Sequence, residues 1–462
     1  LGALQASTFD APHPLISACR EHLDGAELDR FAWALFNGWL YGGTSPKEKW
    51  AMAALGLLGG DDTVNRLAPL VREWPGQSQH QRAVYGLECM RVIGTDTALL
   101  QINRIALKLK FKALQNRARE CMEAIAASRG LTRPELEDRV VPDLGLDENG
   151  SRLFDYGSRQ FTFAAGPDLK PMVREGTGKL IGDLPKPGAK DDPEKAPAAL
   201  AEWKALKKSF REEVKVQAAR LEQAMVTQRH WTAKDFESLI LRHPFMSLPA
   251  RLLVWGAWDA AGQPVGTFRI TEDGTLGNSS DEPFDLSRTA AQVGIIHPLH
   301  LTPDDARAWG ELFSDYAIVP PFPQIGRETH ALEPGEEMKT EITRFDKLSI
   351  PPMALWGTFA SHGWWRGIPQ DAGAVLDHIK QFHSANITVV ADHEPIYISS
   401  PQEGEEGPIS QVLFYSGIRR PDDIPHWSVG AKPDELIALG KVDPVVLSEV
   451  LRDLYTIASK AK

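Results

Sequence analysis

Four side chains in the second half of the chain have the chemistry of an anion site. Arg251, Arg269 and Arg327 could clamp a phosphate or carboxylate group through paired hydrogen bonds, and His297 could carry a proton near neutral pH. If the fold brings them together, they predict a ligand site, or an enzyme acting on a phosphorylated or nucleotide-like substrate. The alternative, which we favour, is an irregular core in which these side chains hydrogen-bond to loops.

Familiar catalytic motifs do not extend this site. The segment Gly176-Thr-Gly-Lys179 resembles part of a phosphate-binding loop, but Val173 stands where a glycine is needed and Leu180 where a serine or threonine must reach magnesium. No G-x-S-x-G nucleophile motif occurs, and all three cysteines fall within predicted helices. We therefore predict a glycine turn at 176–179 and name no catalytic residue.

Histidine and acidic residues offer three candidate groups of metal ligands, which are His297 with His300, His378 with His383, and Asp392-His-Glu394. None has the H-E-x-x-H spacing that turns two imidazole rings toward one ion. We interpret the histidines as structural hydrogen-bonding groups and the acidic segment as a solvated turn. We predict no metal and no cofactor.

A basic stretch lies near the end of the N-terminal helical region. Arg104, Lys108 and Lys112 are spaced four residues apart and Arg119 follows two turns later, so on a helix they would line one edge. Such an edge could bind an acidic protein or a nucleic-acid backbone. A solvated helix face explains the pattern as well, and we favour it because no aromatic residues that could stack on bases are interleaved there.

The composition excludes several classes of protein. The 462 residues are 42% hydrophobic and 24% charged, as in ordinary globular proteins, and no run of about 18 apolar residues occurs. The net charge is -11, and residues 1–140 hold 17 Lys and Arg against 16 Asp and Glu while the remainder holds 34 against 46. This acidic excess argues against a general polyanion binder. Because the chain has three cysteines, no C-x-x-C spacing and no visible secretory signal, we expect a cytoplasmic protein that is not associated with a membrane.

Helices dominate the first third of the chain, where apolar residues repeat at spacings of three and four. The predicted helices are 26–41, 46–58, 61–74, 79–93, 96–107 and 110–128, and the helical run ends near 131–134. No exact sequence repeat is visible. Helix pairs of roughly 35 to 45 residues are nevertheless typical of HEAT or armadillo arrays, with a compact irregular bundle as the alternative.

The rest of the chain predicts an irregular mixed domain, so the fold class is α+β with a HEAT/armadillo-like helical array in front. We expect a helical domain at 1–140, then a region at 141–230 with a small meander, an exposed Pro-rich loop and a long helix at 198–229, and an α+β domain at 231–462. Thr302 before Pro303 predicts a helix start. Strands are expected at 251–258, 265–270, 293–296, 387–391, 396–399 and 411–418, and a final helix at 443–459.

Several strings resemble the MolR-related bacterial family, whose large shared region is a domain of unknown function. The strings that carry the resemblance are the segment from Gly130 to Asp147, Asp155-Tyr-Gly-Ser-Arg-Gln-Phe, Arg229-His-Trp, Arg242-His-Pro-Phe, Leu253-Val-Trp-Gly, His297-Pro-Leu-His-Leu and Pro321-Phe-Pro-Gln-Ile-Gly-Arg327. The resemblance runs from about residue 30 to the end. It implies HEAT-like helices ahead of the shared region and, in some members, a nucleic-acid-associated WGR module, which we do not expect here because Trp365-Arg-Gly367 scrambles its core.

Three functions follow from these patterns. The first is a non-catalytic cytoplasmic regulator or scaffold, in which the helical array binds a protein partner and the α+β domain holds a ligand or second protein. The second is an enzyme that uses the Arg and His residues, and the third is a nucleic-acid-associated protein. We favour the first and leave the question of catalysis open.

Overall fold

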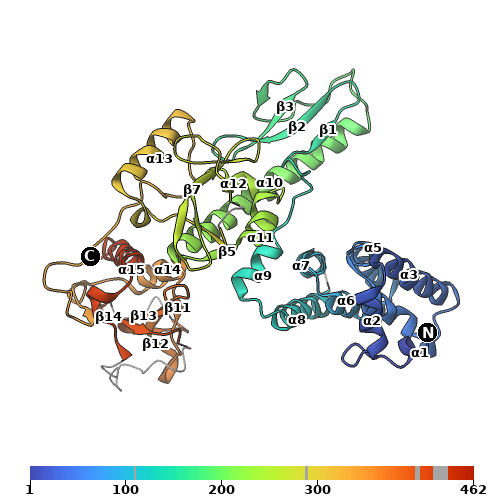
Figure 1. The fold of residues 1–462 in the computed structure, drawn as a ribbon, viewed down its shortest axis with the longest axis horizontal. Coiled ribbons are helices and arrows are strands. Elements are labelled where there is room, and N and C mark those ends of the chain that lie inside the picture. Colours follow the sequence, from blue (N-terminus) through green and yellow to red (C-terminus); the bar gives the residue numbers. More distant parts are fainter. Residues whose placement is uncertain (109–110, 287–289, 401–405, 420–434, 462) are drawn as a thin grey trace. The chain divides into compact units, whose positions relative to one another are not determined.

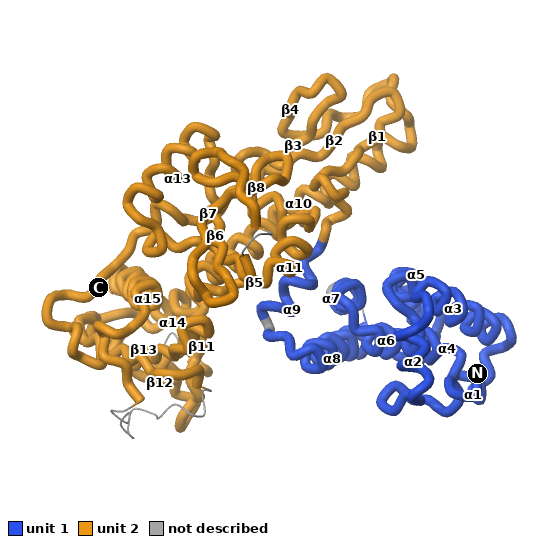
Figure 2. The backbone as a smooth tube through the Cα atoms, in the orientation of Figure 1, with its two compact units in different colours: residues 1–142 blue, residues 143–462 orange. Residues whose placement is uncertain are grey.

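The computed structural model describes residues 1–108, 111–286, 290–400, 406–419 and 435–461 (Figure 1). These residues form two compact units, 1–142 and 143–462, each with its own core (Figure 2). The second unit contains residues 143–230, most of the predicted middle region, together with 231–462.

The first unit is helical. Its helices are α1 (Gly2–Gln5), α2 (Pro14–His22), α3 (Gly25–Tyr41), α4 (Trp50–Leu58), α5 (Asp61–Glu73), α6 (His80–Ile93), α7 (Asp96–Lys108), α8 (Lys112–Ser128) and α9 (Arg133–Arg139). The long helices α3 to α8 agree with the predicted ranges to within a few residues at each end. The apolar period and the glycine turns therefore placed these elements correctly.

Helices α3 to α8 stack as three consecutive pairs, α3 with α4, α5 with α6, and α7 with α8. In neighbouring pairs the first helix contacts the first helix and the second contacts the second. Helices α4, α6 and α8 therefore form one layer, and α3, α5 and α7 form the other. Each pair thereby buries its apolar side against the next pair, which a single pair cannot do alone.

In each turn that follows a pair, a donor group binds an aspartate from near the start of that pair. The Asp29 carboxylate accepts from the Gly60 amide at 2.8 Å, Thr95 Oγ1 donates to Asp61 at 2.6 Å, and Arg129 donates to Asp96 at 2.7 Å. Two of these turns have similar sequences, which the sequence analysis did not note. Leu-Gly-Gly-Asp at 58–61 returns as Ile-Gly-Thr-Asp at 93–96, 35 residues later.

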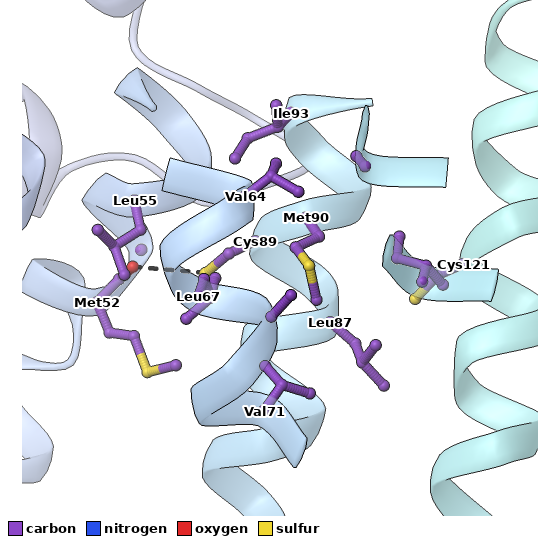
Figure 3. Packing of buried hydrophobic residues seen from close by; sticks show 14 of the residues in the cluster. Met52, Leu55, Val64, Leu67, Val71, Leu87, Cys89, Met90, Ile93 and Cys121 are labelled. Atoms are coloured by element: carbon purple, nitrogen blue, oxygen red, sulfur yellow. Dashed lines mark hydrogen bonds between the residues drawn. The ribbon is translucent and has the colours of Figure 1, made fainter. Parts of the chain in front are cut away.

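The core of the first unit joins both layers (Figure 3). Val64 and Leu67 of α5 meet Leu87 and Met90 of α6, and all four are fully buried. Cys89 donates a hydrogen bond to the Met52 carbonyl on α4, and burial raises the pKa of its thiol to about 12. Cys89 is therefore a protonated core residue without nucleophilic character at neutral pH.

Helix α9 was not predicted. Pro134 was interpreted as the end of the helical run, but proline in a first turn favours a helix start. Thr132 and Glu135 form a reciprocal capping box at this position. The helical region therefore continues to Arg139.

The second unit begins with a four-stranded antiparallel meander, β1 (Leu153–Asp155), β2 (Gln160–Ala165), β3 (Pro171–Glu175) and β4 (Leu180–Ile181), with the predicted glycine turn between the last two. The long helix α10 (Lys195–Val226) packs on this sheet. Trp203 and Phe210 of α10 are buried against Phe154 and Phe163.

A second antiparallel sheet has the order β5-β9-β6-β7-β8. Its strands are β5 (His230–Thr232), β6 (Trp255–Trp258), β7 (Pro264–Ile270), β8 (Leu276–Gly277) and β9 (Gln292–Ile295). Around it lie α11 (Ala233–Phe236), a π-helical turn (Glu237–Leu241), α12 (Ser247–Ala250) and α13 (Pro303–Asp315). The predicted start of α13 is confirmed, because Thr302 Oγ1 accepts from the Asp305 amide at 3.2 Å.

A third antiparallel sheet has the order β10-β14-β13-β12-β11, with strands β10 (Glu341–Ile342), β11 (Trp365–Arg366), β12 (Ala374–Phe382), β13 (Ile387–Tyr397) and β14 (Ile409–Ser416). Helices α14 (Pro352–Ser361) and α15 (Pro444–Ala458) pack against each other beside it. Two expectations were wrong here. Strand β12 was not predicted, and the strands predicted at 387–391 and 396–399 are one strand, β13.

Candidate functional site

Helix α15 carries an unusual number of buried polar side chains. Asp443 caps its first turn by accepting from the Val445 and Val446 amides. Ser448, Glu449 and Asp453 are all less than 3% exposed. Buried polar groups need partners, and every partner of these three comes from another segment of the second unit.

Two of the predicted anion-site residues converge on Glu449. Arg327 donates from Nε to Glu449 Oε1 at 2.6 Å and from a terminal nitrogen to Oε2 at 2.7 Å. His297 Nε2 lies 3.0 Å from the same Oε1, and its Nδ1 accepts from the Leu299 amide. Glu222 of α10 accepts a hydrogen bond from another nitrogen of the Arg327 guanidinium group at 2.6 Å. The hydrogen-bonding groups of Arg327 and His297 that were predicted to bind a ligand therefore bind other residues of the protein.

The charge balance of this cluster fixes its ionisation. Burial by itself would raise the pKa of the Glu449 carboxyl group, but the hydrogen bonds from Arg327 and His297 and the positive charge of Arg327 lower it to about 2. Glu449 and Glu222 also hold the pKa of Arg327 above its usual value, against the effect of burial. Arg327 faces two carboxylates, so no positive charge is left over for an anionic ligand.

The other two predicted residues lie elsewhere. Arg269 is buried on β7, where it donates to Asp281 at 3.2 Å, lies 3.7 Å from Glu272 and stacks over Tyr316 at 4.5 Å. Arg251 follows α12 and is half-buried, and burial lowers its pKa while Glu272 acts in the opposite direction. The structure thus divides the four residues between Glu449 and the neighbourhood of Glu272. The expectation that all four might meet in one pocket is not met.

A second polar group joins β12 to α15 and was missed by the sequence analysis. Lys380 of β12 and Trp364 both donate to Asp453 Oδ2 of α15 at 2.8 Å, and the Lys380 and Asp453 side chains are almost fully buried. The sequence offers no clear signal for this group, because residues 374–382 contain Asp377, His378 and Lys380 and so look like a surface segment.

Two histidines from different candidate metal groups meet beside this ion pair. His378 Nδ1 lies 2.8 Å from His393 Nε2, and His393 Nδ1 lies 2.7 Å from the Glu394 carbonyl oxygen. That carbonyl can only accept, so His393 is protonated at Nδ1, and its Nε2 accepts a hydrogen bond from His378 Nδ1. Burial lowers the pKa of His378 to about 2 and that of His393 to about 4. The pair is neutral, and His383 is not part of it.

The predicted basic edge falls on two helices. Arg104 is on α7 and half-buried, Lys108 ends α7 with its side chain outside the described residues, and Lys112 and Arg119 are exposed on α8. Arg119 donates to Asn116 at 3.1 Å on its own helix. Phe111 is not helical and α8 begins at Lys112, so these four residues do not lie on one continuous helix.

Within the described ranges, no three His, Cys, Asp or Glu side chains gather closely enough to hold a metal ion. In the same part of the chain, no helix combines the length and apolar character needed to cross a membrane.

Comparison with known proteins supports a family of unknown function. Residues 178–364 match the domain of unknown function DUF4132. The chain is also similar to the "Uncharacterized protein YehI" of Escherichia coli (strain K12), with 38% identity over 343 residues. That alignment covers 74% of this chain and 28% of the relative, so the chain spans little more than a quarter of the relative's length. No solved structure matches the chain.

The matched domain ends before β12 and α15. It includes His297 and Arg327, whereas their shared partner Glu449 lies beyond it. The contacts of Glu449 therefore join the matched region to the C-terminal helix. The MolR-like assignment is finer than these matches and stays a prediction.

Proposed function

We propose that this chain is a non-catalytic scaffold or regulator that binds a protein partner through its N-terminal helical array. The array consists of three helix pairs in two layers, with turn contacts that recur about every 35 residues. This arrangement supports a HEAT-like solenoid, in which stacked pairs present a long surface to a partner. We also propose, on the sequence strings quoted above, that the chain is a MolR-like bacterial protein of the cytoplasm.

The observation that supports the proposal most strongly is that the Arg327 and His297 side chains are buried and bound to Glu449. An enzyme of the predicted kind needs an arginine and a histidine that reach a substrate. Here both are hydrogen-bonded to Glu449 inside the second unit and are almost completely excluded from solvent. A scaffold needs no such groups, and its binding energy comes from surface side chains.

Helix α8 offers the surface that we assign to the partner. Lys112 and Arg119 are exposed, while the neighbouring Arg117 is held by Glu88 and by Glu120 at 2.6 Å. The two exposed cations are thus available for carboxylates of a partner. Arg117 belongs to the internal charge network between α6 and α8.

The test is a photocrosslinking amino acid placed at position 119 on α8 and, in a separate protein, at Glu73 on α5. We expect one protein partner to be crosslinked from 119 and not from 73. The double substitution Lys112→Glu with Arg119→Glu should weaken that partner's binding by about tenfold or more. The matched control, Arg20→Glu with Lys47→Glu, changes two exposed cations elsewhere on the same unit and should bind as before.

Equal crosslinking from both positions, or equal binding by the two double variants, would contradict the proposal. Turnover of a phosphorylated or nucleotide-like compound that is lost in His297→Gln, in a protein that is still folded, would favour the enzyme instead. Binding of nucleic acid that falls steeply with salt would favour the third function.

A further inference from the structure

Helix α10 presents a row of four exposed basic side chains, namely Lys204, Lys208, Arg211 and Lys215. Their spacings of four, three and four residues place them on one side of the helix. At 1.5 Å per residue the row is about 16 Å long. We call it the α10 basic row.

The basic row lacks the partners that other cations of the same helix have. Lys207 is paired with Asp183 at 2.6 Å and Lys195 with Asp155 at 3.0 Å. None of the four side chains in the row has an ion pair or hydrogen bond within the described part of the chain. The row therefore presents four positive charges that form no ion pair, and the exposed Glu212 is the one carboxylate of α10 spaced three or four residues from any of them.

Small residues border the basic row. Ala201, Ala205 and Ser209 are exposed and follow each other at intervals of four, which is the spacing of one ridge on a helix surface. Short side chains along such a ridge allow another helix to approach the backbone of α10 closely. The opposite face of α10 is already covered, because Trp203 and Phe210 pack on the meander.

We propose that this face of α10 is a docking site for an α-helix of a protein partner that carries carboxylates at matching intervals. Charge complementarity selects an acidic partner, and the ridge of small residues suits a helix. A long nucleic acid fits less well, since residues 141–462 hold 34 Lys and Arg against 46 Asp and Glu and its phosphates would soon leave the row. Both aromatic residues of α10 are buried, so α10 offers no exposed ring on which a base could stack beside the row. This site is independent of the surface proposed on α8.

The experiment measures binding of the full chain to fluorescent probes by anisotropy. The first probe is a capped helical peptide of about 20 residues with glutamates at intervals of four, three and four, and the second replaces these glutamates with glutamine. The third is a DNA duplex of about 20 base pairs. The row variant carries Lys204→Glu, Lys208→Glu, Arg211→Glu and Lys215→Glu.

The control variant makes the same change in charge at four exposed lysines away from the row, by Lys186→Glu, Lys190→Glu, Lys234→Glu and Lys347→Glu. Thermal melting checks that both variants are folded. We expect the acidic peptide to bind the unaltered chain and the control at least about tenfold more tightly than the row variant, with an affinity that falls as salt rises. The glutamine peptide should bind about tenfold more weakly than the acidic one.

Two results would overturn the proposal. One is tighter binding of the DNA duplex than of the peptide, lost in the row variant, which would make the row a nucleic-acid site. The other is the absence of peptide binding, or peptide binding that the row variant and the control share, which would make the row a solvated helix face.

Discussion

At the scale of single residues, Glu449 is the side chain on which most depends. Its carboxylate neutralises Arg327 and accepts from His297, and all three groups are excluded from water. Removing one partner from a buried ion pair leaves the other charge without compensation. Glu449→Gln should therefore lower the free energy of unfolding by about 3–5 kcal/mol, measured by urea denaturation.

The control for this substitution is Glu311→Gln, which removes one negative charge from an exposed position on α13. We expect it to change stability by less than about 0.5 kcal/mol. A second check is the pair Glu449→Gln with Arg327→Gln, whose effects should be less than additive because they remove one interaction. The cluster would not be structural if Glu449→Gln had only a small effect on stability and if its effect simply added to that of Arg327→Gln.

The His378 and His393 pair predicts how stability depends on pH. Both rings are neutral in the folded protein, with pKa values lowered to about 2 and about 4, whereas in the unfolded chain histidine titrates near 6.5. The unfolded state thus takes up protons first as the pH falls. Stability contributed by the neutral pair is complete above about pH 6.5 and decreases toward pH 4.

Replacing both rings by glutamine removes this titration. We expect His378→Gln with His393→Gln to lower stability at pH 8 but to show a smaller further loss between pH 6.5 and 4 than the unaltered chain does. Thermal melting across this range measures the difference. Parallel curves for the two proteins would mean that other groups cause the acid sensitivity.

The sequence could predict side-chain roles only where partners are near neighbours. Thr302 as a helix cap depends on residues three positions away and was predicted correctly. Glu449 meets Arg327 122 residues away and His297 152 residues away, and no local pattern encodes such a meeting. For the same reason His378 was considered with His383, its neighbour in sequence, and not with His393.

At the scale of elements, the close approach of α4 and α6 depends on Gly56. A Cβ atom at this position would lie 2.9 Å from the Cys89 Cα atom, so the two helices would have to separate. Gly56→Ala should destabilise the protein by about 1–3 kcal/mol. The matched control is Gly38→Ala in the exposed part of α3, where a Cβ meets nothing within 4 Å.

We expect Gly38→Ala to stabilise the protein by about 0.5–1 kcal/mol, since alanine favours helix more than glycine does. The two alanine substitutions should therefore move the melting temperature in opposite directions. If both stabilise, the tight contact between α4 and α6 is not present in solution.

The elements predicted best are those whose surroundings are uniform along their length. Helices α3, α5, α7 and α8 each have one buried side and one solvated side, so their periodicity shows in the sequence, whereas α4 is buried almost throughout and appears as a continuous apolar run. Strand β12 was not predicted because Asp377, His378 and Lys380 make it look like a surface segment, although all three are buried. The hydrophobic pattern does not identify this strand, because its polar side chains acquire their hydrogen-bond partners only in the folded protein.

At the scale of the whole molecule, the two units should fold separately. The core that runs through α1 to α8 lies entirely within residues 1–142. The Glu449 and Asp453 contacts lie entirely within the second unit. We expect residues 1–142 and 143–462, produced apart, each to give a cooperative thermal transition, which calorimetry can measure. Failure of the first piece to unfold cooperatively would show that it depends on the second.

The architecture of the whole chain could be predicted further than its function. Helical pairs followed by an α+β region follow from local patterns, and the 35-residue return of the glycine and aspartate turn was present in the sequence. The candidate site could not be predicted, because it depends on which arginines and histidines are neutralised by distant carboxylates. That selection is a property of the folded chain.

The central claim is that the helical array binds a protein while the buried arginine and histidine residues serve the fold. The most direct measurement is the affinity of residues 1–142 alone for the partner crosslinked from position 119, compared with the affinity of the full chain. We predict equal affinities within about threefold and no measurable binding by residues 143–462. Binding that resides in 143–462 and disappears on Arg327→Gln, with that piece still folded, would contradict the account.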